Sequence, residues 1–555
     1  MSQQKYRQFT NDSSKDQFYF SDSNGKHLAT PNSKNDNIVQ EAQSVFIQDS
    51  RYSEMGEVLT KTSPELTQPI KCELNEGGVI PDWLQGSFLR LGPGKFEWGN
   101  TAYKHVFDGD CLIHKFQIKN GHVYYSNRFL ESDFHKKNAK YNRISTMGFG
   151  TWAPPDPCSN IFKRMFLYFI PALKNDNCNV KPINVKDSEI WASTETPWIL
   201  QLDKDTLKTL RSENTMDSVG IGAQGWLAHP HYDSEGNLYN FSVKQKPTCR
   251  YDVIKIPMRP GSTEKEPFKG AEIVASIPTS QSLSAYYHSF GMTDNYFILF
   301  ENPFYIKSVF AVMTMNIFKK SFLDILKWKP EYGTLIRVID RKTGKEMRRI
   351  KVNPVFVFHH VNAYEENGDI IVDVAAYPDA SIVSALYLKQ LREGHKGEWV
   401  KLPNLYRYRL PIAQLQDTTA DVLDLPTDKT GRDYECIAAD FEMPTINYEM
   451  CNGKPYRYTY GVDTPFGHFI SKVDVQNKTK VNWYPGEHYS VSEGYFIAKP
   501  GAKLEDDGVV VSSVTGVKGK PSFLVILDAR TFSEIARATL PFAPALTIHG
   551  NFVQG

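Results

Sequence analysis

Four histidines stand in short, well-separated segments that are suited to holding a metal ion. They are His229 in the run AHPH, His288 in YYHSFG, His359 in FHHVNAYEE and His549 in TIHGNF. No Cys, Asp or Glu stands out as a companion ligand. A site built only from neutral imidazoles leaves the charge of a divalent metal uncompensated and can leave coordination positions open. These properties favour redox-active iron over a closed structural zinc site.

Histidines next to this set need a separate weighing, because the chain contains 14 of them. A lone histidine is more often a hydrogen-bonded structural residue than a ligand. Successive side chains on an extended strand point to opposite faces. Only one of the adjacent His359 and His360 can therefore face a central metal. His231 follows His229 with one proline between them.

Carboxylates that could support the histidines are the next feature. A ligating histidine usually donates its second N–H to a carboxylate, which fixes the ring and raises its basicity. Glu195 in STETPW, Glu442 in FEMP and Glu493 in SEGYF lie in apolar, strand-like settings and are the candidates. The alternative is that each is an ordinary solvated glutamate.

Ligands this far apart require a fold that returns the chain repeatedly to one axis. Most of the sequence consists of short strand patterns separated by Asp, Asn and Gly clusters, and long helical periodicity is nearly absent. This pattern predicts an all-β closed architecture, and a β-propeller closes itself by radial repetition. No clean repeat sets the number of blades. Strands are predicted at residues 122–130, 236–243, 295–301, 369–377, 508–514 and 522–529.

Two segments break the strand pattern, at residues 155–173 and 308–328. In the second, Phe318, Phe322 and Ile325 share one face of a predicted amphipathic helix whose other face carries lysines. Such a helix can lie in a membrane interface. The same periodicity fits a helix that packs over the core of its own domain, and the pattern alone does not separate the two.

The composition excludes some classes of partner. The chain has 41% hydrophobic and 23% charged residues and a formal net charge of +1. It has no basic tract, so no nucleic-acid partner is expected. Aromatic residues reach 13%, which fits a β-rich core and also an apolar tunnel. The seven cysteines include no CxxC pair, which indicates free thiols in a reducing compartment.

The first 58 residues are rich in Ser, Asn, Gln, Asp and Lys. They predict a disordered polar tail, residues 1–58, before one folded domain, residues 59–555. This N-terminus has no apolar signal core, and its aspartates do not support mitochondrial import. No apolar run approaches the length of a membrane span. We therefore expect a cytoplasmic protein that can touch a membrane from the side.

The motifs, taken in order, resemble those of the animal carotenoid cleavage oxygenases, with the beta-carotene oxygenases the nearest branch. This family also contains the retinoid isomerohydrolase of the retinal pigment epithelium. The resemblance runs from about Leu59 to Phe552. Asp110 and Cys111 depart from the residues usual in their stretch, and Ser159 stands where a lysine usually follows PDPC. The matching runs are GSFLRLGPGKFEWG, HVFDGDCLIHKF, PDPC, AHPHYD, YYHSFGMT, FHHVNAYEENG, EMPTINY, GKPYRY, EDDGVV and TIHGNF.

This resemblance implies a seven-bladed β-propeller with a cap of helices and loops over an axial metal site. One Fe(II) per chain is expected on the propeller axis, and the FHHVN match favours His359 over His360 as a ligand. The expected ligands are His229, His288, His359 and His549, supported by Glu195, Glu442 and Glu493. The membrane-binding segments of the family match the two segments that break the strand pattern. The membrane-contact candidates are Phe162, Phe166, Phe318, Phe322, Ile325 and Cys158, the last at a position that is lipidated in some members.

The implied reaction is cleavage of one carotenoid double bond by O2 to give retinal or apocarotenal aldehydes, without an acid, base or nucleophile from a side chain. GPGKFEWG and residues 329–344 resemble the eccentric 9′,10′ branch, whereas FHHVNAYEENG and GKPYRY resemble the central 15,15′ branch. We favour the eccentric position slightly. The alternatives are a retinyl ester isomerohydrolase and a non-catalytic carotenoid-binding protein. The oligomeric state does not follow from the sequence.

Overall fold

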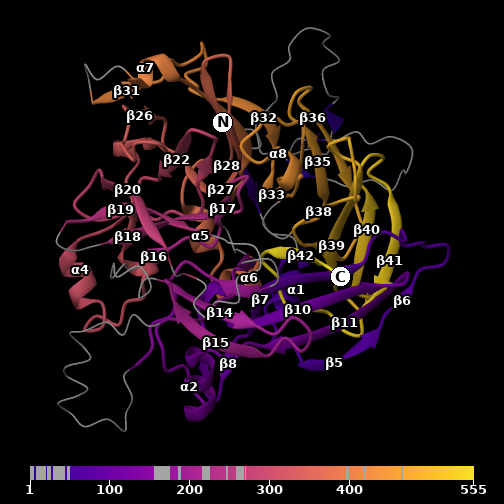
Figure 1. Cartoon of the computed structure of the whole chain (residues 1–555). Coiled ribbons are helices and arrows are strands. Elements are labelled where there is room, and N and C mark those ends of the chain that lie inside the picture. Colours follow the sequence, from indigo (N-terminus) through magenta and orange to yellow (C-terminus); the bar gives the residue numbers. More distant parts are fainter. Residues whose placement is uncertain are drawn as a thin grey trace.

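The computed structural model describes most of the chain. It covers residues 6–7, 20–21, 27–28, 44–46, 50–154, 175–185, 189–215, 225–244, 248–257, 268, 270–394, 399–416, 421–463 and 467–555. Within these residues, seven sheets of four or more strands stand around a common centre (Figure 1). This is the predicted seven-bladed β-propeller.

The first four blades hold the N-terminal half of the fold. In sheet order, blade one is β42 (Gly550–Gln554), β7 (Gly86–Lys95), β10 (Asp110–Lys119), β11 (His122–Phe129) and β5 (Leu66–Lys71). Blade two is β12 (Lys181–Val185), β13 (Glu189–Ser193), β14 (Trp198–Leu202) and β15 (Thr209–Asn214). Blade three is β16 (Gly225–Trp226), β18 (Leu238–Lys244), β19 (Arg250–Ile256) and β20 (Glu272–Pro278), with β17 (His231–Tyr232) also on β18. Blade four is β21 (Gly291–Met292), β22 (Tyr296–Glu301), β25 (Thr334–Asp340), β26 (Arg349–Val352) and β31 (Val422–Asp424).

The last three blades complete the ring. Blade five is β27 (Phe356–Glu366), β28 (Asp369–Tyr377), β30 (Asn404–Pro411) and β32 (Glu435–Ala439). Blade six is β33 (Glu442–Thr445), β34 (Tyr458–Val462), β35 (Ile470–Asp474) and β36 (Thr479–Trp483). Blade seven is β37 (Tyr489–Val491), β39 (Gly508–Gly516), β40 (Phe523–Asp528), β41 (Glu534–Thr539) and β6 (Glu73–Leu74), with β38 (Tyr495–Ala498) also on β39.

The ring is closed by pairing between the two ends of the fold. β42, at the C-terminal end, pairs antiparallel with β7. β6, near the N-terminal end, pairs antiparallel with β41 of the last blade. Each closing strand turns an open sheet edge into a paired one. The C-terminal strand is thereby ordered, against the usual tendency of chain ends to fray.

The blades pack face to face, which explains the continuous apolar runs of their middle strands. β28 is buried at every residue after its first. Ile298, Val338 and Val372 are fully buried in one cluster between blades four and five. A strand covered on both faces reads as an unbroken Val/Ile/Ala run rather than as an alternation. For this reason the six predicted strand segments were recognisable, and each contains a strand.

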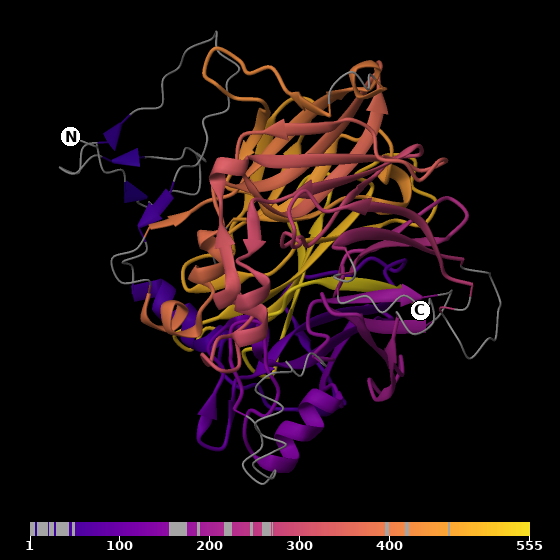
Figure 2. The ribbon, with the colours of Figure 1, turned by 90° about the vertical axis from the view of Figure 1, so that its left-hand side faces the viewer.

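Helices and loops form a cap at one end of the ring. Figure 2 shows α1 (Ser50–Leu59) beside α6 (Leu388–Glu393), and these two helices pack together. Their buried side chains share one large apolar cluster with aromatic residues of blade five. α1 begins within the segment predicted as the tail. The other described helices are α2 (Asp133–Tyr141), α4 (Val309–Thr314), α5 (Ser381–Ala385), α7 (Ile412–Gln416) and α8 (Tyr448–Cys451).

The helix predicted over residues 308–328 is wrong in its length. α4 ends at Thr314, and Lys319 has a positive φ of 53°, which turns the chain. The side chain of Asp324 accepts hydrogen bonds from the backbone N–H and hydroxyl of Ser321. Such local bonds compete with helix formation. The segment ends in β24 (Leu326–Trp328), which pairs with β23 (Phe304–Ile306).

Two further expectations concern cysteines and membrane spans. The six cysteines among the described residues are free thiols, as predicted, and Cys158 lies outside those residues. None of the described helices is both long and apolar enough to cross a bilayer. The predicted apolar segment at residues 155–173 also falls outside the described residues.

Candidate metal centre

The four histidines predicted as ligands meet on the propeller axis. His229 lies between β16 and β17, His288 lies just before β21, His359 is part of β27, and His549 directly precedes β42. One ring nitrogen of each lies within 4.8 Å of the corresponding nitrogen of every other. The fold thus brings four distant segments to one point.

The nitrogens that converge are Nε2 atoms. The Nε2 atoms of His229 and His288 are 3.0 Å apart, and those of His359 and His549 are 3.1 Å apart. The rings of His359 and His549 are nearly perpendicular, at 80°. Three of the four imidazoles are buried and the fourth, His229, is partly exposed.

Three of the imidazoles are held by glutamates through their other nitrogen. Nδ1 of His288 is 2.5 Å from Oε1 of Glu195. Nδ1 of His359 is 2.7 Å from Oε2 of Glu442. Nδ1 of His549 is 2.8 Å from Oε1 of Glu493. These are the three carboxylates named from the sequence, where the alternative was a solvated side chain. Glu442 and Glu493 are 2% and 5% exposed.

The glutamates determine which ring nitrogen carries the proton. A carboxylate only accepts, so the neutral imidazole that faces it must donate from Nδ1 and leave Nε2 unprotonated. In the pair of His359 and His549, two Nε2 lone pairs then face each other across 3.1 Å. Two acceptors at this distance repel unless a cation lies between them. The donor set therefore fits a metal ion, and imidazole nitrogens suit iron, copper, nickel and zinc.

Each glutamate is itself anchored. The hydroxyl of Tyr286 donates to Oε1 of Glu195 at 2.5 Å. The backbone N–H of Met443 donates to Glu442. The backbone N–H of Gly550 donates to Oε2 of Glu493 at 2.8 Å. The carboxylates are thus fixed before any ligand arrives, as expected where the partners of ligands orient a metal site.

Arg90 of β7 connects Glu493 to the end of the chain. Its guanidinium is fully buried and lies 3.3 Å from Glu493. It also donates to the hydroxyl of Thr547 at 2.8 Å and to the carbonyl of Ile548 at 2.9 Å. A buried charge must be paired, and Arg90 pairs with Glu493 while it also bonds the two residues that precede His549. No local sequence pattern around Arg90 indicates this role.

Burial and neighbouring charges set the ionisation of the site. Burial lowers the pKa of His549 to about 3, against the raising effect of Glu493. Burial also lowers the pKa of His288 and holds that of His229 well below its ordinary value. Burial opposes the charge on Glu493, but His549, Arg90 and Lys181 outweigh it and lower its pKa to about 2. At neutral pH the imidazoles of His229, His288 and His549 are therefore uncharged, and each keeps a lone pair on one ring nitrogen.

His229 differs from the other three histidines. Its Nδ1 faces no carboxylate and lies 3.3 Å from Nζ of Lys181, the first residue of β12. Burial lowers the pKa of Lys181, while Glu493 raises it. Lys181 was not predicted from the sequence, because a single lysine at the start of a strand carries no pattern.

The neighbouring histidines point elsewhere. Nδ1 of His360 is 2.8 Å from the hydroxyl of Ser289, on the side of β27 away from the four-histidine cluster. Nε2 of His231 is 2.9 Å from the carbonyl of Phe290. Neither belongs to the cluster. Strand alternation therefore separates His359 from His360, and His359 is the one that joins the cluster, as the motif resemblance favoured.

Aromatic side chains adjoin the cluster on the side of the cap. The ring of Phe358 lies 5.5 Å from that of His288. Phe358 contacts Phe356 at 4.7 Å between ring centroids, and Phe356 stacks on Tyr286 at 5.9 Å. These rings form an apolar wall beside the four-histidine cluster.

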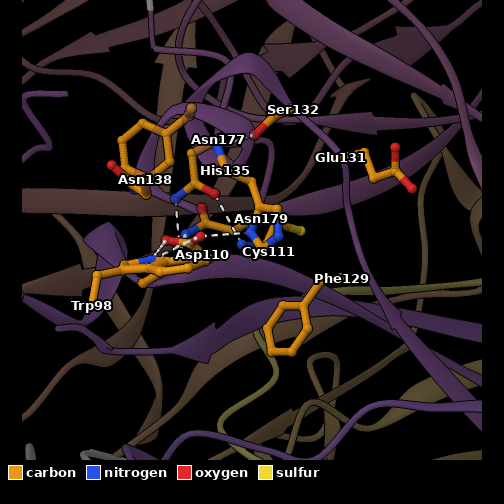
Figure 3. A network of polar contacts seen from close by, with 12 residues as sticks. Trp98, Asp110, Cys111, Phe129, Glu131, Ser132, His135, Asn138, Asn177 and Asn179 are labelled. Atoms are coloured by element: carbon orange, nitrogen blue, oxygen red, sulfur yellow. Dashed lines mark hydrogen bonds and ion pairs between the residues drawn. The ribbon is translucent and has the colours of Figure 1, made fainter. Parts of the chain in front are cut away.

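Asp110, which departs from the resembled motif, belongs to a separate polar network (Figure 3). It is fully buried and accepts hydrogen bonds from Trp98 Nε1 at 3.2 Å and from Tyr103 at 2.6 Å. Its other oxygen lies 2.7 Å from Nδ1 of His135. Because His135 belongs to α2, the network ties this helix to the first blade.

Among the described residues, the four-histidine group is the one that could hold a metal.

The predicted membrane-contact residues separate in the structure. Phe318 is 60% exposed, whereas Ile325 is 3% exposed and Phe322 packs against the apolar cluster of the cap. The prediction for Ile325 is therefore wrong, because the short 3-10 turn at residues 323–325 faces the core. Phe322 is partly buried, and its contact with a membrane stays a prediction. Phe162, Phe166 and Cys158 lie outside the described residues.

Comparison with known proteins places the chain in a family. The family model described as retinal pigment epithelial membrane protein matches residues 59–554. The beta,beta-carotene 15,15′-dioxygenase of Rattus norvegicus is 36% identical, with 89% of this chain and 91% of the relative covered. The mitochondrial carotenoid-cleaving dioxygenase of Mustela putorius furo is 35% identical, with 89% and 96% covered.

The fold also matches solved structures. A variant of the Synechocystis apocarotenoid oxygenase superposes with a TM-score of 0.72 at 22% identity. The match covers 93% of this chain and 100% of the Synechocystis chain. At this identity the likeness concerns the fold.

Substitution of the two adjacent histidines of β27 tests the geometry. His359→Ala removes one converging Nε2 and leaves Glu442 without its imidazole partner, so the variant is expected to lose bound metal. His360→Ala removes a hydrogen bond to Ser289, at a cost of about 1 kcal/mol, and is expected to keep its metal. Elemental analysis of both purified variants after anaerobic Fe(II) loading gives the comparison. Equal metal content in the two would contradict the assignment.

Proposed function

The chain belongs to the carotenoid oxygenase family that includes the retinal pigment epithelial membrane protein, and from this we propose that it is an iron-dependent dioxygenase that cleaves one double bond of a carotenoid. The curated relatives reported above are named as carotene or carotenoid dioxygenases. The proposed cofactor is one Fe(II) per chain, held by the Nε2 atoms of the four clustered histidines. The observation that carries the proposal is the convergence of these four nitrogens with glutamates behind three of them.

The residues of the proposed site have different roles. When bound, Fe(II) supplies redox activation of O2 at the coordination positions that four imidazoles leave open. Glu195, Glu442 and Glu493 hold three imidazoles in the ligating tautomer. Phe358 and Tyr286 supply an apolar wall for the polyene. In the overall reaction the carbon–carbon double bond breaks and each carbon receives one oxygen atom of O2. The alkene therefore supplies the electrons, and no reductant is consumed.

The position of the cleaved bond is the finer part of the proposal. The relatives whose names specify a bond specify 15,15′. We therefore propose central cleavage. The eccentric 9′,10′ position, which two segments of the sequence favoured, lacks that support, since the relatives named only as carotenoid-cleaving are no more similar, at 35% and 36% identity.

Product identification tests this proposal. Purified, iron-loaded protein under air is expected to convert beta-carotene to retinal alone, whereas eccentric cleavage gives a long apocarotenal and a short ketone. His359→Ala, which is expected to lose the metal, is the control and is expected to give no product. Liquid chromatography with mass detection identifies the cleaved bond. The same reaction under 18O2 in place of air identifies the origin of the oxygen. Turnover of a retinyl ester to a cis retinol without carotenoid cleavage would contradict the oxygenase proposal and favour the isomerohydrolase.

A carotenoid dissolves in lipid, and one surface of the protein suits contact with a membrane. α4 turns Ala311 and Val312 toward the apolar cluster of the cap. Its other face exposes Phe310 and Met313, at 68% and 60%. Large exposed apolar side chains gathered on one helix mark an interaction site. With Phe318 they support the proposal that α4 enters the interface of a bilayer, with exposed Lys319 and Lys320 at its edge.

Vesicle sedimentation tests this surface. The variant Phe310→Glu/Met313→Glu is expected to reduce the fraction bound to phosphatidylcholine vesicles about tenfold, because two apolar side chains leave the interface. Val79→Glu is the control, since Val79 is 71% exposed on a loop beside blade seven. Its binding is expected to equal that of the wild type. Unchanged binding by the double variant would contradict the proposal.

A further inference from the structure

Lys181 lies beside the four histidines, at the position where each of the other three imidazoles has a carboxylate. It begins β12, and the carbonyl of the preceding residue, Val180, accepts from the backbone N–H of His549 at 3.2 Å. The backbone at this point is therefore tied to the cluster. The amine of Lys181 lies 3.3 Å from Nδ1 of His229.

The hydrogen-bond directions around Lys181 form a chain. A lysine ammonium only donates, so Nδ1 of His229 accepts and its proton must lie on Nε2. That Nε2 can then donate across 3.0 Å to Nε2 of His288. His288 in turn donates from Nδ1 to Glu195, 2.5 Å away. Every group in this sequence is satisfied, from the ammonium at one end to the carboxylate at the other.

This chain conflicts with metal binding by all four histidines. A neutral His229 that binds a metal through Nε2 must carry its proton on Nδ1. That N–H would point at the N–H groups of Lys181, and the two donors would oppose each other. The other three histidines meet no such conflict, because each faces a carboxylate that accepts.

We propose that Lys181 is a positioning residue of the metal centre that competes with the metal for His229. Its amine holds His229 in the tautomer that donates to His288, so the metal must displace that hydrogen bond before His229 becomes a ligand. His229 is then the weakest of the four ligands, and Lys181 sets the affinity of the site. This inference rests on the proposed ligation by four histidines and adds a residue that controls it.

A set of substitutions at residue 181 tests the competition. Lys181→Gln offers Nδ1 of His229 a carbonyl acceptor, and Lys181→Met keeps the length of the side chain without a donor. Both are expected to bind Co(II) about tenfold more tightly than the wild type, within the range measured for partners of metal ligands. Lys181→Arg keeps a donor at this position and is expected to bind no more tightly than the wild type.

Two readouts separate this role from a structural one. Anaerobic titration followed by the visible absorption of Co(II) gives both affinity and ligand field, and thermal unfolding of the metal-free variants reports their stability. Nitrogen NMR of histidine-labelled protein without metal is expected to show one cluster imidazole protonated on Nε2 in the wild type and on Nδ1 in Lys181→Gln. Affinities within about twofold of the wild type in Lys181→Gln and Lys181→Met, or an unchanged tautomer, overturn the proposal. Failure of the wild type and of every variant to bind Co(II) overturns instead the four-histidine centre on which it rests.

Discussion

The hydrogen bond from a histidine Nδ1 to a glutamate is the interaction on which the centre depends. It fixes the tautomer, and so directs the Nε2 lone pair of the same ring toward the axis. Three such bonds, from His288, His359 and His549, direct three lone pairs toward one point. Lone pairs at this spacing repel one another unless a cation is present. The same bonds that orient the rings therefore also favour the binding of a metal ion between them.

The propeller makes this arrangement possible, because it brings inner segments of different blades to one axis. The arrangement also explains why the end of the chain is buried. His549 directly precedes the closing strand β42, and Arg90 of the partner strand β7 bonds both to that segment and to Glu493. Closure of the ring and assembly of the site therefore depend on the same contacts. A fault in the pairing of β42 would disturb the fold and the metal centre together.

Much of this centre could be predicted from the sequence, for identifiable reasons. The histidine motifs are local, and strand alternation allowed only one of His359 and His360 to face the metal. The resemblance to the family's motifs then favoured His359 and the three glutamates. Continuous apolar runs revealed the middle strands of the blades. Lys181 and Arg90 were not found, because their roles depend on which strands become neighbours. The helix over residues 308–328 was overextended, since periodicity cannot report the turn at Lys319. That error also placed Ile325 on the surface, whereas the 3-10 turn buries it.

X-ray absorption of the iron-loaded protein measures the coordination of iron by imidazole nitrogens directly. We expect one iron per chain with a first shell of nitrogen and oxygen atoms and the multiple scattering of four imidazole rings. A shell with sulfur or with two or fewer imidazoles, or protein that folds but takes up no iron, would contradict it.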